Sequence, residues 1–567
     1  MSSTENQPDG VGWGIDRPLP AVDDENRYYW TAGADGVLRF QQCSACHALL
    51  HPPQPVCRYC RCDDIGITAV SGRGVIVGLT VNHQEWDPAF PPPFVIVSVA
   101  IDDDPRVRVI SNLVGAGAAD AEVGMRVRVA FVQAADVWLP FFELDGGQAD
   151  ELPTDETPPD GHRALIRPML RSEKFEDKVA ITGLGMSSIG RRLMVPGLRL
   201  TVAAAKAAIA DAGLEMSDID GLSTYPGSSA PGFSEGGVTA LEDALGIRPT
   251  WYNGGAETFG PAGSLIAAML AVAAGLARHV LCFRTVWLAT YAAQQRAAKP
   301  DDANPYGMGG RRGRVPGYMA PYGVGSAANN LALYASHHFR RYGTTRESLG
   351  WIALTQRHNA GLNPRAIYRD PLTMDDYLSA RLISTPFGLY DCDVPVDASI
   401  AVIVSSIEAA ADLAKPPVLV EAVGTQITER VAWDQSTLTH EPQALGPAAH
   451  LWSRTSLRPA DVQVAELYDG FSFNCLSWIE ALGFCGIGEA KDFLAGGQNI
   501  ALHGGVVALN THGGQLSAGR THGMGLVHEA ITQLRGEAGD RQVRNAQVAV
   551  VSSGGLTPAG AMLFRKA

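Results

Sequence analysis

The stretch ALNTHGGQLSAGRTHGMGLVHE, residues 508–529, decides the fold of the second half of the chain. It begins with a short apolar run, continues through a glycine-rich loop with His512, Arg520 and His522, and ends in a helical pattern that begins near Gly525. Glycine has no Cβ and accepts positive φ, so the backbone of such a loop can approach a ligand closely. Backbone N–H groups at a helix start can then bind a carbonyl or phosphate oxygen. A tight strand-to-helix turn without a ligand is the alternative.

The plan of this stretch has a counterpart in the first half of the same region. Residues 201–225 and 446–468 each combine an alanine-rich helix with a strand that ends at a tyrosine. A glycine-rich turn and a long helix follow in each half, and the apolar runs 279–286 and 546–553 close the two patterns. Alternating strands and helices predict layered α/β packing, and the repetition predicts two similar halves about a pseudo-twofold axis.

Five of the nine cysteines lie between residues 43 and 62. Cys43 and Cys46, followed by Cys57 and Cys60, form two C-x-x-C knuckles, which is the spacing of a tetrahedral site for zinc. Four protein ligands leave no open coordination position, so a structural Zn²⁺ is expected. Cys62 is an alternative to Cys60 as the fourth ligand.

Residues 72–133 alternate apolar and polar side chains between turn signals, which predicts antiparallel strands of an OB-fold β-barrel. An acidic, proline-rich linker follows at residues 145–161. We therefore divide the chain into an N-terminal helix and zinc ribbon, an OB-fold, a linker and two α/β halves, with the bounds 1–66, 67–145, 146–177, 178–415 and 416–567.

The composition excludes several classes of function. A formal net charge of -14 over 567 residues argues against nucleic-acid binding, which needs clustered lysine and arginine. The N-terminus lacks the basic and apolar regions of a signal peptide, and the longest apolar run, residues 263–276, is shorter than the roughly 20 residues of a membrane span. A cytoplasmic protein that does not enter the membrane is expected.

Two parts of the sequence resemble known families. The zinc knuckles and the strands that follow are similar to the zinc-ribbon and OB-fold family that accompanies thiolase-like enzymes. The segments ELYDGFSF (466–473), NTHGGQLSAGR (510–520) and VVSSGGLTPAGAMLF (550–564) resemble motifs of the thiolase superfamily, in its lipid-transfer-protein-like branch. The resemblance implies a duplicated αβαβα fold, work on the thioesters of coenzyme A, and a homodimer.

The chain departs from a working thiolase where the chemistry occurs. Gly260 stands in the position of the nucleophilic cysteine, Arg520 follows Gly519 where a thiolase has histidine, and Ser552 stands near the place of the second cysteine. Acyl transfer through a covalent cysteine thioester is therefore not expected. Thiolase-type acyl transfer through Cys392 is kept as an alternative, and it would require free CoA.

Within this branch, the chain resembles aldolases that cleave steroid side chains. The resemblance implies retro-aldol cleavage of a β-hydroxyacyl-CoA to a ketone and a shorter acyl-CoA, with a hydratase upstream. A non-catalytic acyl-CoA carrier or scaffold is the other alternative, and the acyl group stays open.

The candidate site residues are proton-handling and oxyanion-binding groups. Tyr468 is expected to transfer the hydroxyl proton, with Asp469 or His522 tuning it; His522 is the second candidate for the base. His512 and the amides near Gly513 and Gly514 would hold the enolate oxygen. The remaining candidates for substrate binding are Asn510, Arg520, Gly260 and Tyr322.

Overall fold

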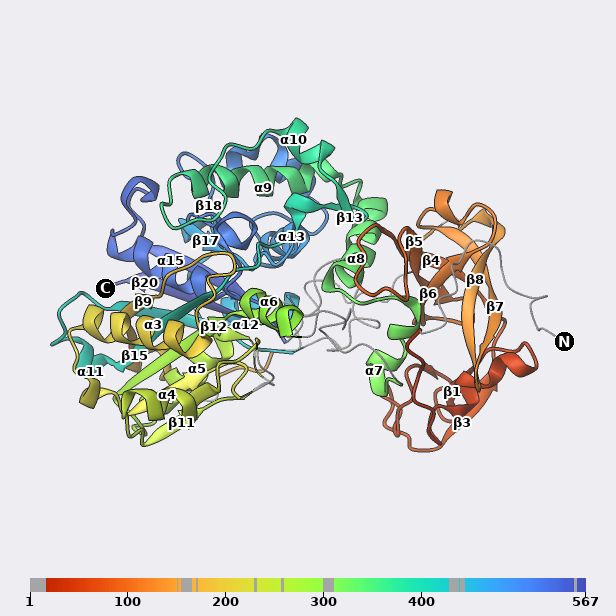
Figure 1. Ribbon diagram of the computed structural model, residues 1–567, viewed down its shortest axis with the longest axis horizontal. Coiled ribbons are helices and arrows are strands. Elements are labelled where there is room, and N and C mark those ends of the chain that lie inside the picture. Colours follow the sequence, from red (N-terminus) through yellow and green to blue (C-terminus); the bar gives the residue numbers. More distant parts are fainter. Residues whose placement is uncertain are drawn as a thin grey trace.

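The computed structural model describes residues 17–149, 151–153, 166–169, 172–228, 232–255, 258, 260–298, 311–427, 438, 444–554 and 558–567. Figure 1 shows the N-terminal β-rich region at one end of the molecule and the larger α/β region at the other, with α8 (Ala327–Tyr342) between them. Much of the linker predicted at 146–177 falls outside the described residues. No helix of the described part is long and apolar enough to cross a membrane.

The zinc ribbon is a three-stranded antiparallel sheet next to a short helix. Its strands are β1 (Arg39–Cys43), β2 (Leu49–Leu50) and β3 (Ile65–Ala69), in the order β2-β1-β3. The helix α1 (Arg27–Trp30) buries Tyr29 and Trp30.

The predicted OB-fold is confirmed as a closed five-stranded barrel. The order of its strands is β4-β5-β6-β8-β7, and pairing of β4 with β7 closes it. Side chains of the barrel strands are buried, among them Val97, Val99, Phe141 and Phe142, each with an exposed fraction of 0%. The strands are β4 (Arg73–Asn82), β5 (Phe94–Ile101), β6 (Asp104–Val114), β7 (Met125–Ala134) and β8 (Val137–Gln148).

The α/β region contains one ten-stranded sheet with the predicted internal repeat. The order is β11-β10-β12-β15-β9 in the first half and β16-β20-β19-β17-β18 in the second, joined where β9 pairs with β16. Counted from the outer edge of the sheet, each half has two parallel pairings followed by two antiparallel ones, so the halves are related by a pseudo-twofold axis. The strands are β9 (Val179–Met186), β10 (Gly221–Thr224), β11 (Trp251–Asn253), β12 (His279–Val286), β15 (Ala398–Ser406), β16 (Val418–Gly424), β17 (Val464–Glu466), β18 (Ala508–Leu509), β19 (Val548–Ser553) and β20 (Gly560–Lys566).

Helices form layers on both sides of this sheet (Figure 1). The helices α5 (Pro261–Ala273) and α15 (Met524–Arg535) contact strands of both halves and form the central layer, whereas α3 (Gly197–Ala212) and α12 (Leu445–Ser453) each cover one half. The thiolase-like layered fold is thereby confirmed. The other helices are α4 (Gly237–Leu245), α6 (Leu288–Ala298), α7 (Arg314–Gly317), α9 (Arg346–Gly361), α10 (Met374–Ser379), α11 (Ile407–Ala410), α13 (Ser472–Ala481) and α14 (Ala490–Leu494).

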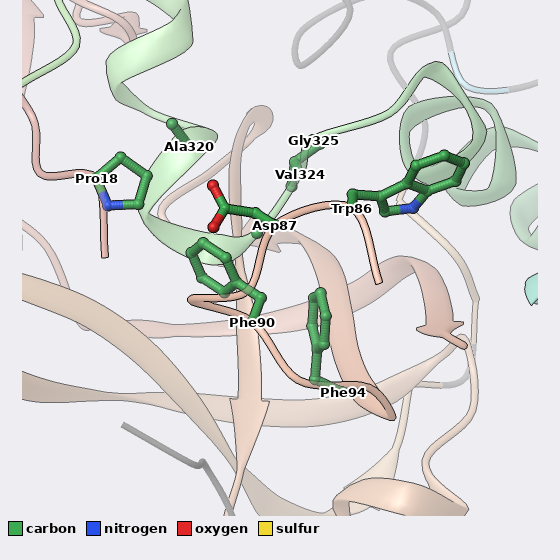
Figure 2. Close-up of a pocket in the computed structure, with 9 residues that line it drawn as sticks. Pro18, Trp86, Asp87, Phe90, Phe94, Ala320, Val324 and Gly325 are labelled. Atoms are coloured by element: carbon green, nitrogen blue, oxygen red, sulfur yellow. The ribbon is translucent and has the colours of Figure 1, made fainter. Parts of the chain in front are cut away.

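The barrel and the α/β region contact each other through strand pairing and hydrogen bonds. A hairpin of β13 (Leu382–Ser384) and β14 (Phe387–Gly388) extends the barrel sheet by pairing with β4. His337 of α8 places Nδ1 2.8 Å from the carbonyl oxygen of Val77. Figure 2 shows a small, largely apolar cavity beside this junction, where Phe90 and Phe94 face the segment from Ala320 to Gly325. None of the residues lining it belongs to the loops that carry Tyr468 or His512.

Candidate active site

Three loops meet at the carboxyl ends of β17, β18 and β19, because β17 runs parallel to both neighbours. Tyr468 follows β17, Asn510 follows β18 and Ser552 lies in β19. The Asn510 side chain accepts the Leu467 N–H at 2.6 Å and donates to the Leu467 carbonyl at 2.9 Å, while Ser552 Oγ accepts the Tyr468 N–H at 2.8 Å. The buried Asn510 side chain therefore fixes the backbone that leads into Tyr468.

The glycine-rich loop has the strained backbone that its sequence predicts. Gly513 and Gly514 have φ of 108° and 59°, and a π-helical turn spans Gly514–Ala518 before α15 begins at Met524. Asn510 and His522 also adopt positive φ, 43° and 54°. Such backbone costs about 1–3 kcal/mol per non-glycine residue and is concentrated at functional sites.

A segment of the first half, residues 391–397, forms backbone hydrogen bonds with this loop. The N–H groups of Asp393 and Val394 donate to the carbonyl oxygens of Gly470 and Gln515, at 3.1 and 3.0 Å. The Arg520 N–H donates back to the Val394 carbonyl at 2.8 Å. The acidic turn at 391–397 thus holds both site loops in place.

Asp469 is completely buried beneath the glycine-rich loop. Its Oδ2 accepts the Gln515 N–H at 2.8 Å and the Leu516 N–H at 3.4 Å, whereas Oδ1 has no hydrogen-bond partner in the described structure. Burial raises the pKa of Asp469 to about 7, although the positive charge of His512 and these two N–H groups act in the opposite direction. Asp469 therefore titrates near neutral pH, where a proton-handling group is effective.

His512 is held by a buried glutamate. Its Nδ1 lies 3.1 Å from Glu466 Oε2, and Glu466 has an exposed fraction of 0%. Burial alone lowers the pKa of His512, but the hydrogen bond and charge of Glu466 outweigh it and raise the pKa above its ordinary value. Thr511 donates to the buried carboxylate of Glu529, which pairs with Arg541. His512 is thus oriented by Glu466 through Nδ1.

His522 is oriented by an arginine of the opposite half. Arg284 of β12 is 2% exposed, and its Nη2 lies 2.5 Å from His522 Nδ1. A guanidinium only donates, so Nδ1 accepts and the proton of the neutral imidazole is on Nε2. Burial, followed by the charges of Arg284 and Arg520, lowers the pKa of His522 well below its ordinary value. His522 therefore presents a neutral Nε2–H donor.

The Tyr468 side chain lies close to the backbone at Gly470 and at Gly523. A Cβ added to Gly470 would be 3.2 Å from the Tyr468 hydroxyl oxygen, and one added to Gly523 would be 3.6 Å from its ring. Burial lowers the pKa of Arg284 to about 10, and the charge of an ionised Tyr468 acts in the opposite direction. A positive charge near a tyrosine hydroxyl favours its ionised form.

Arg520 faces the carboxylate of Asp393. Its Nη1 lies 3.4 Å from Asp393 Oδ1, and burial raises the pKa of Asp393 to about 6 against the opposing charge of Arg520. No hydrogen bond or ion pair between Arg520 and Asp469 is found among the described residues.

The other two predicted substrate-binding residues are Gly260 and Tyr322. Gly260, with φ of 61°, precedes α5, at the position related by the pseudo-twofold axis to the loop before α15; residues 256, 257 and 259 beside it are outside the described ranges. Tyr322 is in the core of the N-terminal region, 5.7 Å between ring centroids from Phe141 of the barrel. Arg17 donates to the neighbouring Pro321 carbonyl, which helps to hold this segment against the barrel. The structure does not bring Tyr322 together with Tyr468.

The zinc site has the predicted four ligands. The sulfur atoms of Cys43, Cys46, Cys57 and Cys60 all lie within 4.8 Å of one another, with Cys43 to Cys60 at 3.4 Å and Cys46 to Cys57 at 3.5 Å. Sulfur atoms about 2.3 Å from a tetrahedral zinc ion are roughly 3.8 Å apart, so this donor set fits structural zinc. Cys62 is outside the group and lies 3.7 Å from Ser44 Oγ.

Comparison with known proteins agrees with this architecture. Family models match residues 424–563 as a thiolase C-terminal domain-like region, residues 68–132 as the C-terminal OB-fold domain of ChsH2, and residues 30–65 as the rubredoxin-like zinc ribbon domain of ChsH2. A steroid side-chain-cleaving aldolase of Thermomonospora curvata is 33% identical over 397 residues, which are 68% of this chain and 97% of that protein. The chain belongs to the thiolase-like family of the steroid side-chain-cleaving aldolases.

Two further relatives of this aldolase family match the same share of the chain. The 17-hydroxy-3-oxo-4-pregnene-20-carboxyl-CoA lyase of Mycobacterium tuberculosis is 31% identical over 393 residues, 68% of this chain and 99% of that protein. The solved Ltp2-ChsH2(DUF35) aldolase superimposes with a TM-score of 0.60 at 30% identity, over 69% of this chain and 98% of that chain. The resemblance seen in the sequence is confirmed.

The cysteines of this aldolase-family chain do not provide a thiolase nucleophile. Cys392 donates weakly to the Gly388 carbonyl at 3.6 Å, and burial together with Asp391 and Asp393 raises its pKa well above the ordinary value. Burial also raises the pKa of Cys282 and of Cys485. A reactive thiolate needs the opposite shift.

The sequence did not predict the buried charged residues that contact the two site histidines. Arg284 and Glu466 are both buried charges within apolar strands, HVLCFRTV and VAE. A charge at such a position is costly unless it is paired, so its presence was the available signal. The pairing itself was not visible, since Arg284 and His522 are 238 residues apart.

Proposed function

We propose that the protein is an acyl-CoA aldolase that cleaves a β-hydroxyacyl-CoA without a cysteine nucleophile. A base removes the proton of the β-hydroxyl, the bond between Cα and Cβ breaks, and the C–O bond becomes a carbonyl. The electron pair of the broken bond passes to the thioester as an enolate, which is then protonated at Cα. The products are a ketone and a shorter acyl-CoA. The relatives named for steroid side-chain cleavage support this reaction class.

The observation that carries the proposal is the replacement of thiolase chemistry by oriented proton-handling groups. Tyr468, His512 and His522 lie on loops fixed by Asn510 and by buried charged partners. A site that had lost its function would not be expected to retain the two buried charges behind these histidines, because each buried charge costs free energy.

In this proposal Tyr468 takes the hydroxyl proton. The positive charge of Arg284 stabilises the tyrosinate, and the neutral Nε2–H of His522 donates a hydrogen bond at the hydroxyl or the departing carbonyl. Because Nδ1 of His522 already accepts from Arg284, we assign His522 the role of donor rather than base.

The other side of the site stabilises the enolate. His512, protonated through its hydrogen bond with Glu466, and the backbone near Gly513 and Gly514 are placed to hold the thioester oxygen as it becomes negative. Ionised Asp469 adds a negative charge that keeps His512 protonated. We assign Asp469 this tuning role.

The test is steady-state cleavage of a tertiary β-hydroxyacyl-CoA with a steroid ring, comparing wild type with Tyr468→Phe. We expect kcat to fall by about 10²- to 10⁴-fold while KM changes little, because only a proton transfer in the transition state is removed. The matched control is Tyr59→Phe, which removes a hydroxyl from an exposed residue of the zinc ribbon. Equal kcat in wild type and Tyr468→Phe would refute the assignment.

We also propose a homodimer and a hydratase that supplies the substrate. The strand β11 is at the edge of the ten-stranded sheet, and Tyr252 in it is 68% exposed. An edge of this kind is suited to pairing with a second copy. A β-hydroxyacyl-CoA forms when water adds to an enoyl-CoA, so a hydratase is the expected preceding enzyme. Light scattering after size-exclusion chromatography would give twice the mass of one chain.

A further inference from the structure

A cavity of about 220 Å³ lies beside the site and carries four arginines. It is formed by Arg191 and Arg192 after β9, by α6, and by Arg520 of the glycine-rich loop. Pockets that enclose a whole small-molecule ligand are typically about 300–1,000 Å³, so this one is suited to a charged group of a larger ligand. The lining residues are Arg191, Arg192, Leu288, Ala289, Ala292, Arg296, Pro395 and Arg520.

The positive charges of this cavity exceed the negative charges of the carboxylates that the structure describes near it. Within the part of the chain that the structure describes, Asp393 is the one carboxylate at ion-pair distance from any of the four guanidinium groups, 3.4 Å from Arg520. Four positive charges therefore face one carboxylate in a protein whose formal net charge is -14. Such a local concentration of positive charge attracts an anion even when the whole protein is acidic.

Two of the arginines are tied directly to the site loop. Arg191 Nη1 donates to the Tyr368 hydroxyl at 2.6 Å, and the Tyr368 N–H donates to the Ser517 carbonyl in the π-helical turn at 3.0 Å. Arg520 is itself part of the loop between Gly514 and α15. An anion bound in the cavity would therefore be fixed relative to the loop that holds His512 and His522.

We propose that this cavity binds phosphate groups of the coenzyme A moiety, and so directs the thioester toward Tyr468. This inference rests on the proposed function, since it takes the substrate to be a CoA thioester. Coenzyme A carries a pyrophosphate and a 3′-phosphate, and the planar fork of arginine matches phosphate oxygens in pairs. The apolar wall formed by Leu288, Ala289 and Ala292 borders the charged groups.

The experiment measures binding of adenosine 3′,5′-bisphosphate by calorimetry to the full chain and to Arg192→Gln, Arg296→Gln and the double variant. Neither residue forms an ion pair with a carboxylate of the described residues, and neither belongs to the proposed catalytic groups. We expect Kd to rise on the order of tenfold per arginine and to rise further in the double variant. The matched control is Arg199→Gln, which removes an exposed arginine of α3 that does not line the cavity. Inorganic phosphate should bind much more weakly and with a smaller dependence on the variants.

Kinetics separate this inference from the proposed function. With a CoA thioester, the double variant should raise KM with little change in kcat. With the pantetheine thioester, which lacks the nucleotide, the double variant should change neither KM nor kcat.

Unchanged Kd and KM in the double variant, with cleavage intact, would overturn the phosphate site alone. Absence of cleavage by wild type, with variant-dependent binding of the bisphosphate, would overturn the proposed reaction and leave the phosphate site supported. Inorganic phosphate binding as tightly as the bisphosphate would assign the cavity to free phosphate and overturn the CoA inference.

Discussion

Replacing Asp469 with asparagine should remove a pH dependence of stability that this single carboxyl imposes. The side chain is completely buried, and burial raises its pKa to about 7. In the unfolded chain an aspartate has a pKa of about 3.9. Between these two values the folded protein holds a proton that the unfolded chain has released, so the free energy of unfolding falls as pH rises.

The magnitude follows from the size of the shift. A change of about 3 pKa units at about 1.36 kcal/mol per unit gives about 4 kcal/mol in total, of which about 2.5 kcal/mol falls between pH 5 and pH 8. Asparagine has nearly the same shape, its amide oxygen can still accept the Gln515 N–H, and it does not titrate. The stability of Asp469→Asn relative to wild type should therefore increase with pH.

The assay is urea unfolding of both proteins at pH 5, 6, 7 and 8, in which the difference between them cancels the titration of all other groups. The kcat/KM of wild type should also rise with pH toward about 7 as Asp469 ionises, and the variant should lack this limb. A difference in unfolding free energy that stays constant from pH 5 to pH 8 would refute the account of Asp469.

Three further predictions concern other parts of the molecule. Arg284→Met should raise the pKa of His522, because the charge of Arg284 adds to burial in lowering it, and should increase the loss of kcat/KM at acid pH, whereas Arg284→Lys keeps the charge; identical pH profiles for all three proteins would contradict the role of Arg284. Gly514→Ala should destabilise the fold by at least about 2 kcal/mol in urea unfolding, because a Cβ would meet Asp469 Oδ2 at 2.1 Å and Gln356 Oε1 at 2.3 Å. The matched control is Gly536→Ala, at a glycine with φ of 77° and open space around the added Cβ. Equal losses of unfolding free energy in the two variants would count against steric conflict at Gly514. Cys46→Ser should reduce the measured zinc content below one ion per chain and lower Tm, and a full zinc complement in the variant would contradict the four-cysteine site.

The sequence predicted those features that depend on spacing within a short segment. The two cysteine knuckles predicted the zinc ligands, since four thiols at that spacing can converge only when the knuckles face each other. The repeated pattern of helix, strand and glycine-rich turn predicted the two halves and the layered fold, because hydrophobic periodicity is carried by each element separately.

Features that depend on distant segments were not predicted. Glu466 and His512 are 46 residues apart, and only parallel pairing of β17 and β18 places them side by side. Tyr322 illustrates the same limit. It lies in a tyrosine-containing segment of the α/β region, but contacts between residues 17–21 and 311–322 hold that segment on the barrel. No local pattern indicates a contact across some 300 residues.

The most direct test of the aldolase account is product analysis for wild type acting on a tertiary β-hydroxyacyl-CoA in the absence of free CoA. The account predicts one ketone and one shorter acyl-CoA for each substrate consumed, with the same rate when CoA is added. Cleavage that occurs only with added CoA, or tight binding of the thioester with no ketone released, would contradict it.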